Sequence, residues 1–81
     1  SVHAIADGQA EAVEFVVEES TPHCNTPLKQ MRLKPDVLIS NITHGVTSFI
    51  PNGDSVFAPG DRIVVVTSRR GSLQQLGDIF A

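Results

Sequence analysis

The chain has few of the residues that usually identify a function. Its 81 residues include one cysteine, no tryptophan, no tyrosine and only four phenylalanines. The single cysteine, Cys24, cannot form an internal disulfide, which is consistent with a reducing compartment such as the cytosol. No apolar run approaches the ~18 residues of a membrane-spanning helix, so we expect no direct membrane insertion.

Basic residues are scarce as well. Six Lys and Arg stand against nine Asp and Glu, which gives a formal net charge of −3. The sequence has no basic run and no aromatic platform on which bases could stack. It also contains neither of the glycine-rich phosphate-binding motifs, G-x-G-x-x-G and G-x-x-x-x-G-K. We therefore expect this chain alone to bind no nucleic acid, and to bind neither NAD nor ATP more tightly than ~100 μM.

Residues that bind metals or catalyse reactions are few and poorly spaced. The only soft metal ligands are His3, His23, His44 and Cys24. They lack the paired spacings of closed zinc sites, and no orienting acid or oxyanion motif accompanies the cysteine. We predict a non-enzymatic domain without a metal site. Asp54 and Asp61 each follow a glycine in a turn, so their carboxylates are interpreted as acceptors for nearby backbone amides.

What the sequence does contain is a series of short β-rich runs separated by identifiable turns. Gly45 comes first in a two-residue loop, which predicts a type II′ hairpin. The predicted cross-strand pairs are His44 with Thr47, Ile42 with Phe49 and Asn41 with Ile50. The Pro51 to Asp54 segment ends the second run, because proline has no amide proton and Asn-Gly tolerates positive φ.

The next turn leads into the most apolar run of the chain. Ala58-Pro59-Gly60-Asp61 predicts a type II turn, whose second central residue needs positive φ. Arg62 to Thr67 then returns as an antiparallel strand. Its residues Ile63 to Val66 predict a central position with burial on both faces.

Outside this region the patterns are weaker. Alternation over Glu11 to Val17 predicts a strand. Thr26-Pro27 predicts the start of a short helix that ends before Pro35. Ser72 with Gln75 resembles a capping box, and Leu73, Leu76 and Phe80 then form the apolar stripe of a C-terminal helix. Ser1 to Gly8 and Ser20 to Asn25 are assigned no element.

These elements together predict an α+β fold. It is a small, mostly antiparallel sheet with a short helix and a C-terminal helix packed on it. Residues 1–81 form a single domain, in which residues 1–10 are interpreted as a connector from an upstream domain. A domain of this size buries little more than ~60% of its unfolded surface, so self-association is expected.

Polar side chains gather at the predicted hairpin next to apolar ones. The candidate ligand-binding residues are Asn41, Thr43, His44, Phe49 and Pro51. Such a mixture resembles the rim of a small ligand site. A solvent-exposed hairpin tip with no ligand explains the same residues, and from these residues alone it is the favoured interpretation.

Four segments of the chain carry a family resemblance. They are GQAEAVE at residues 8–14, LKPDVLI at 33–39, IPNGD at 50–54 and PGDRIVVVT at 59–67. In this order and spacing they resemble the C-terminal domain of the TrkA family, the C-lobe of the domains that regulate potassium conductance. The resemblance is strongest to the last lobe of the peripheral Trk potassium-uptake subunit, and it covers nearly the whole chain.

The resemblance implies a regulatory, ligand-sensing lobe that forms a homodimer and gates a membrane potassium channel or transporter. The subunit would be cytoplasmic, on the inner face of the cell membrane, with NAD or ATP bound by a separate Rossmann lobe that this chain lacks. Some relatives bind cyclic di-adenosine monophosphate between paired C-lobes. Where the family often has Arg, this chain has His44, which lacks a permanent forked charge. Two alternatives remain: a purely structural assembly module, and the same lobe appended to another ion or solute transporter.

Overall fold

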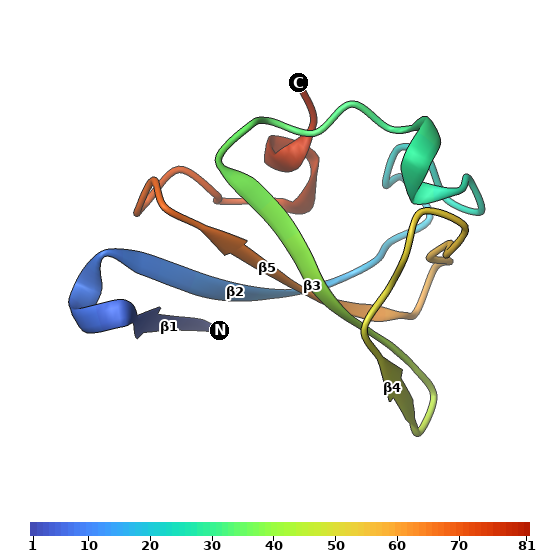
Figure 1. Ribbon diagram of the computed structural model, residues 1–81. Coiled ribbons are helices and arrows are strands. Elements are labelled where there is room, and N and C mark those ends of the chain that lie inside the picture. The colour runs from blue at the N-terminus through green and yellow to red at the C-terminus, as the bar shows by residue number, and fades with distance from the viewer.

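The computed structural model describes residues 1–81 and contains one antiparallel sheet with connecting segments gathered on one side of it (Figure 1). The strands are β1 (Val2–Ile5), β2 (Ala10–Val16), β3 (Val37–His44), β4 (Thr47–Phe49) and β5 (Arg62–Thr67). They are arranged in the order β1-β2-β5-β3-β4, and every neighbouring pair is antiparallel. The central position predicted for β5 is confirmed.

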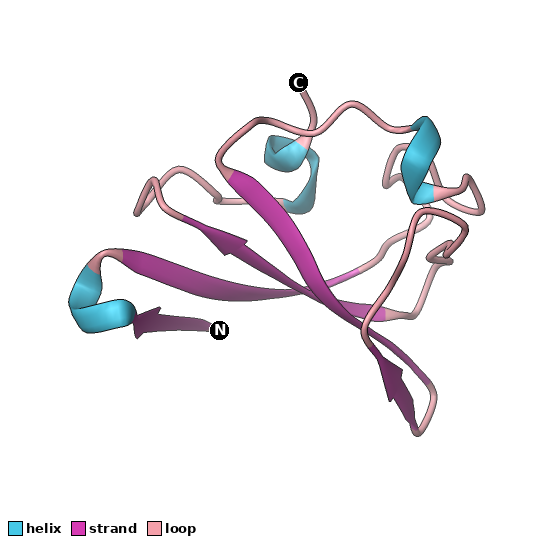
Figure 2. Ribbon diagram, in the orientation of Figure 1, coloured by secondary structure: helices cyan, strands magenta, loops and turns pink.

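Helical structure is limited to three short 3₁₀ segments (Figure 2). They are η1 (Ala6–Gly8), η2 (Leu28–Gln30) and η3 (Leu76–Ile79). The prediction of an α+β fold with helices packed on the sheet is therefore wrong, because the sheet has five antiparallel strands and the chain has no α-helix. The helix predicted after Thr26-Pro27 is only the 3₁₀ turn η2. No helical segment has the length and apolarity needed to cross a membrane.

The predicted C-terminal helix fails because its capping signal acts at a different residue. Gln75, rather than Ser72, is the N-cap, and it forms a capping box with Asp78. The box therefore starts only the short segment η3. Gly77 lies within this segment, where its backbone freedom disfavours a longer helix.

The end of the chain then becomes extended. Phe80 forms an isolated antiparallel bridge with Leu33. The Lys34 amide donates to the Ile79 carbonyl at 2.9 Å, and the Ala81 amide donates to a carbonyl in the same neighbouring segment, also at 2.9 Å. Backbone groups that a helix would pair internally are thus paired with a distant part of the chain.

The turns were predicted more successfully than the helices. Gly45 has φ +59°, and the ladder pairs Ile42 with Phe49 and His44 with Thr47, as expected. The predicted pair of Asn41 with Ile50 is absent, because β4 ends at Phe49, shortly before a proline that has no amide to extend the ladder.

The type II turn before β5 is confirmed. Gly60 has φ +93°, and the Asp61 amide donates to the Ala58 carbonyl at 3.0 Å. The N-terminal residues, to which no element was assigned, contain η1 and the edge strand β1, which pairs with β2.

A bulge in β3 sets which side chains face the core. Ile39 pairs with Val65, but the next paired residue, Asn41, lies opposite Val64, so Ser40 is extra. The Ser40 hydroxyl donates to the Val64 carbonyl at 3.2 Å. The extra residue lets Ile39 and Ile42, three positions apart, both be buried.

The core lies between one face of the sheet and the segments that cover it. Ile42, Ile63 and Val65 contribute from the strands, and the cover contributes mainly apolar side chains of loops and η3. The buried apolar residues are Val13, Val17, Met31, Ile39, Ile42, Phe57, Ile63, Val65, Leu73, Leu76 and Ile79. The 3₁₀ segments and loops therefore cover the inner face of the sheet, where the sequence had predicted helices.

The other face of the sheet, which we call the outer face, has no cover. On β5 the inward-facing residues are buried, whereas Val64 and Val66 are only half-buried, so the predicted burial on both faces is wrong. On the neighbouring strands the side chains of Val16 and Leu38 are 57% and 62% exposed. This domain thus presents apolar side chains of adjacent strands to its surroundings.

Candidate functional site

The largest hollow of the molecule, about 470 Å³, lies between the β3–β4 hairpin and the loop that leads into β5. Its walls combine apolar and hydrogen-bonding side chains. The lining residues are Asn25, His44, Thr47, Phe49, Val56, Ala58 and Asp61. Small-molecule sites commonly combine apolar walls with a few polar groups, and this hollow has that composition.

Strand alternation explains how the hairpin supplies its part of the wall. Ile42 faces the core, so His44, two residues further along β3, lies on the same face. The hairpin register places Thr47 opposite His44 and Phe49 opposite Ile42. The face of the hairpin that continues the core face of the sheet therefore forms one side of the hollow.

Asp61 is the polar centre of this site. It is 4% exposed, and its Oδ2 accepts a hydrogen bond from the Ala58 amide at 2.9 Å. Its Oδ1 lies 2.6 Å from Nδ1 of His44, whose side chain is 76% exposed. An ionised carboxylate only accepts hydrogen bonds, so Nδ1 carries the hydrogen in this contact. Each carboxylate oxygen thus accepts a hydrogen bond, which offsets the cost of burying the charge.

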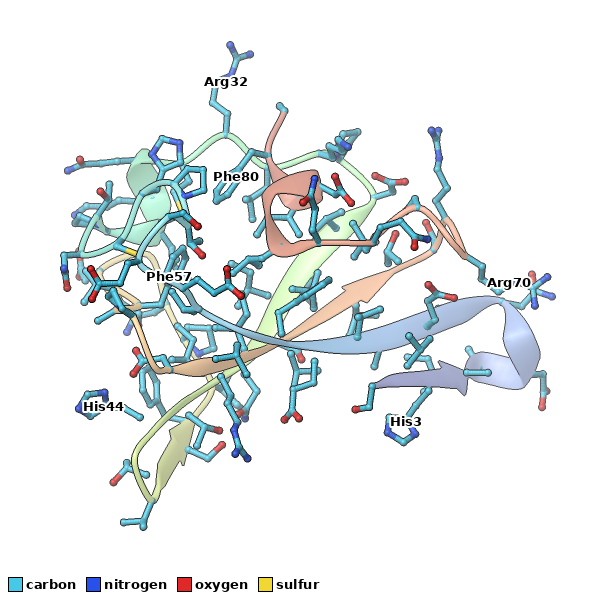
Figure 3. The ribbon with its side chains drawn as sticks, turned by 180° about the vertical axis from the view of Figure 1, so that it is seen from behind. His3, Arg32, His44, Phe57, Arg70 and Phe80 are labelled. Atoms are coloured by element: carbon cyan, nitrogen blue, oxygen red, sulfur yellow. The ribbon has the colours of Figure 1, made fainter.

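Figure 3 shows His44 beside the hairpin, at the opposite end of the molecule from Arg70. The structural role predicted for the Asp61 carboxylate is confirmed by its bond to the Ala58 amide. The Asp54 carboxylate differs from the expectation, because it accepts from Nζ of Lys29 at 2.6 Å in an exposed ion pair.

The predicted site residues fall into separate groups. His44 and Phe49 line the same hollow. Asn41 and Thr43 lie on the opposite face of β3, where the Thr43 hydroxyl donates to Oγ of Ser48 at 3.1 Å and the Ser48 hydroxyl donates to Asn41 Oδ1. Pro51 is half-buried just beyond β4 and is not one of the lining residues.

Sequence reasoning did not assign Asn25, Val56 and Asp61 to this site. Asn25 has φ +61°, and its amide donates to the Phe57 carbonyl at 2.7 Å, which joins two loops far apart in the chain. Nothing in the local pattern of the Ser20 to Asn25 loop indicates this contact. The sequence predicted the turn that contains Asp61, but it did not predict that Asp61 lies close to His44 in space.

The remaining reactive side chains have ordinary structural contacts. The ring of His23 lies against Phe80, with centroids 4.9 Å apart. The Cys24 thiol donates to the Thr21 carbonyl at 3.4 Å. No group of three or more His, Cys, Asp or Glu residues is placed to hold a metal ion.

One carboxylate outside the hollow has a perturbed acidity. Backbone amides of Gln75, and then of Gln74, donate to Asp78 at 3.0 and 2.8 Å and lower its pKa from the ordinary aspartate value. These bonds favour the ionised form. Asp78 therefore serves as the charged half of the capping box that starts η3.

Known proteins similar to this chain point to one family. The chain is 30% identical over 57 residues to Trk system potassium uptake protein TrkA homolog 1 of Methanosarcina mazei. The match covers 70% of this chain and 13% of that protein, so the chain spans only a small part of its relative's length.

The fold has a counterpart among solved structures. A chain described as "Structure of RCK domain with cda" superposes with a TM-score of 0.66 over 86% of this chain and 97% of that one, at 21% identity. At this level of identity the likeness shows a shared fold. The profile of the TrkA-C domain matches residues 12–81. Since that match includes β3, β4, β5, most of β2 and the segments that cover the sheet, the chain belongs to the TrkA-C domain family.

Proposed function

We propose that this chain is a regulatory lobe of a Trk-type potassium-uptake protein that binds a small ligand beside the β3–β4 hairpin and pairs with a second copy of itself. The observation that carries the proposal is the hollow built around His44 and Asp61. The potassium-uptake relative supports a role in potassium uptake. Within this proposal the chain belongs to a cytoplasmic subunit on the inner face of the membrane, as the family resemblance implies. NAD or ATP is then assigned to a separate Rossmann lobe outside this chain.

The composition of the hollow supports ligand binding. Phe49, Val56 and Ala58 supply apolar area, and His44 and Asn25 supply hydrogen-bonding groups. The exposed ring of His44 has its Nε2 free, because Nδ1 is engaged by Asp61. A few fixed polar groups on an apolar wall orient a small ligand.

The outer face of the sheet supports pairing. It presents Val16 and Leu38 largely exposed, next to the half-buried Val64 and Val66. The same face carries Glu14 and Arg62 on adjacent strands, which provides opposite charges for a symmetric contact. Covering this face with a second copy removes apolar surface that the small domain cannot cover alone.

Regulation follows if a ligand distinguishes two arrangements of the paired lobes. A ligand that binds one arrangement more tightly shifts the equilibrium by at most that difference in free energy. The shift is transmitted through the rest of the subunit to a membrane potassium channel or transporter. A ligand with equal affinity for both arrangements produces no gating.

Cyclic di-adenosine monophosphate is the first compound to test, as the family resemblance implies. Its phosphates are anionic, and the Asp61 carboxylate repels them unless His44 is protonated. Histidine changes charge between about pH 5 and 8, so binding is expected to strengthen as the pH falls.

The test is a titration of the dinucleotide followed by backbone amide shifts at pH 6 and pH 8. We compare the wild type, His44→Ala and the control His23→Ala, whose ring lies against Phe80 outside the hollow. The expected result is shifts at Thr47, Phe49 and neighbouring residues, larger at pH 6, lost in His44→Ala and kept in the control.

Other outcomes reject this site. Shifts confined to Asn41 and Thr43 place the ligand on the other face of the hairpin, and shifts confined to η3 remove it from the hairpin altogether. A complete absence of shifts, with pairing preserved, favours the purely structural assembly module.

A further inference from the structure

Asp61 joins four parts of the chain at the hollow. Its backbone amide closes the type II turn with Ala58, and its carbonyl accepts from the Val17 amide, just after β2, at 2.8 Å. It stands immediately before β5. Its carboxylate holds the Ala58 amide on one oxygen and His44, from the end of β3, on the other. The last contact is the only one of these that depends on a titratable donor.

This contact connects the β3–β4 hairpin with the rest of the chain. The last paired residue of β3 against β5 is Thr43, opposite Arg62, and β4 pairs with nothing but β3. Residues 44–50 therefore pair with no strand other than β3 and β4, and the hairpin projects beyond the end of β5, as Figure 1 shows. The bond from His44 to Asp61 is the only side-chain hydrogen bond that joins this projecting segment to the chain outside β3 and β4.

From this geometry we propose that His44 and Asp61 form a pH-dependent clasp that holds the β3–β4 hairpin over the hollow when His44 is charged and loosens it when His44 is neutral. The bond to Asp61 exists in both forms, since Nδ1 donates in each. With His44 charged the contact is an ion pair, whereas with His44 neutral only the Asp61 acceptor carries a charge, so protonation adds Coulombic attraction to the hydrogen bond. This attraction is present where His44 is protonated and is lost where it is neutral.

No other charge in the hollow competes with this pair. Of the lining residues only His44 and Asp61 ionise. Arg62 follows Asp61, but it lies opposite Thr43 and Val16 in the ladder and so belongs to the outer face. On the loops that supply Asn25 and Val56, the Lys29 ammonium is paired with the Asp54 carboxylate and His23 lies against Phe80.

The clasp is a property of the chain itself and stands whether or not the proposed ligand binds. It makes the hairpin wall of the hollow a movable part whose position follows the protonation of one exposed ring. In a regulatory lobe, such a part couples ligand access to the pH of the surrounding solution.

The first experiment determines the hydrogen position on His44. Imidazole nitrogen shifts of the 81-residue chain are recorded between pH 5 and pH 8.5. The expected result for neutral His44 is the Nδ1–H form, because Asp61 accepts that hydrogen, whereas free histidine prefers Nε2–H. His23 serves as the internal comparison, since its ring has no carboxylate partner. Finding the Nε2–H form at His44 overturns the clasp.

The second experiment measures how strongly the contact between His44 and Asp61 stabilises the hairpin. Amide exchange of β4 is expressed as protection relative to the intrinsic rate at each pH. Between pH 5.5 and pH 8 we expect protection to fall by up to about fivefold in the wild type, which is the upper end of the coupling in an exposed ion pair. His44→Gln removes the titration at an exposed position and is expected to show low, pH-independent protection. His23→Gln is expected to behave as the wild type. Equal protection in the wild type and His44→Gln at both pH values overturns the proposal.

Discussion

Replacing Phe57 tests whether loops, rather than helices, complete the core of this domain. Phe57 is 0% exposed and lies in the irregular segment between β4 and β5. Its carbonyl accepts the Asn25 amide at 2.7 Å, so its ring and its backbone secure two loops at once. In Phe57→Ala the backbone bond can persist, and the loss is that of the buried ring.

The expected loss is large compared with the total stability. Removing a buried phenylalanine ring lowers the free energy of unfolding by about 3–5 kcal/mol, from lost burial and from the cavity left behind. A domain of this length has a total free energy of unfolding of roughly 4–12 kcal/mol. Phe57→Ala is therefore expected to be marginally folded at 25 °C.

Urea unfolding followed by far-ultraviolet circular dichroism measures this loss, since the chain has no Trp or Tyr for fluorescence. Protein concentration must be equal in all samples, because association raises apparent stability. The matched control is Phe49→Ala, which removes a ring that is 37% exposed, and its loss should stay below about 2 kcal/mol. If Phe57→Ala lost no more stability than the control, the loops would not be part of the core.

Three further predictions concern a turn, a carboxylate and the outer face. Gly60→Ala should destabilise the domain by about 1–2 kcal/mol in urea unfolding, because φ is +93° there, whereas Gly77→Ala should be neutral or mildly stabilising, since its φ is not positive and no atom crowds a new Cβ. Carboxyl carbon shifts should show that the pKa of Asp78 lies below the ordinary aspartate value, because two backbone amides donate to its carboxylate. Its contribution to stability should be present above the ordinary aspartate range and disappear as the pH falls through the lowered pKa, and a midpoint in the ordinary range would contradict the bonds to its carboxylate. In sedimentation equilibrium at tens of micromolar the chain should be a dimer, Leu38→Glu should be largely monomeric and Val46→Glu, at the hairpin tip, should remain a dimer; monomeric wild type would reject pairing through the outer face.

Local chemistry explains what the sequence could predict. The turns at Gly45 and Gly60 were found because a positive φ at a defined position requires glycine, and no distant residue is needed to decide it. The central position of β5 was predicted because a run of four β-branched apolar residues is rarely found in an exposed edge strand. His44 and Phe49 were placed together because a hairpin of known loop length has a known register.

What could not be predicted depends on contacts between distant residues. A capping pattern at Ser72 competed with one at Gln75, and pairing of the chain end with Leu33 decided between them. Nothing near Val2 indicates that its segment adds a strand beside β2. The approach of Asp61 to His44 likewise follows from the sheet order and not from either local sequence.

The extra residue at Ser40 has a consequence for the evolution and engineering of this lobe. A strand has two-residue parity, and an extra residue exchanges the faces of everything beyond it unless a bulge absorbs that residue. Because the bulge absorbs Ser40, His44 shares the core side with Ile39, although the two are five positions apart in sequence. A regular strand that kept Ser40 would force a choice: either Ile42 stays buried and Ile39 turns outward, or Ile39 stays buried and the hairpin presents Thr43 to Asp61 in place of His44. Deleting Ser40 should instead leave Ile39, Ile42 and His44 on the core side. The bulge, remote from the hollow, therefore determines which side chain the hollow receives.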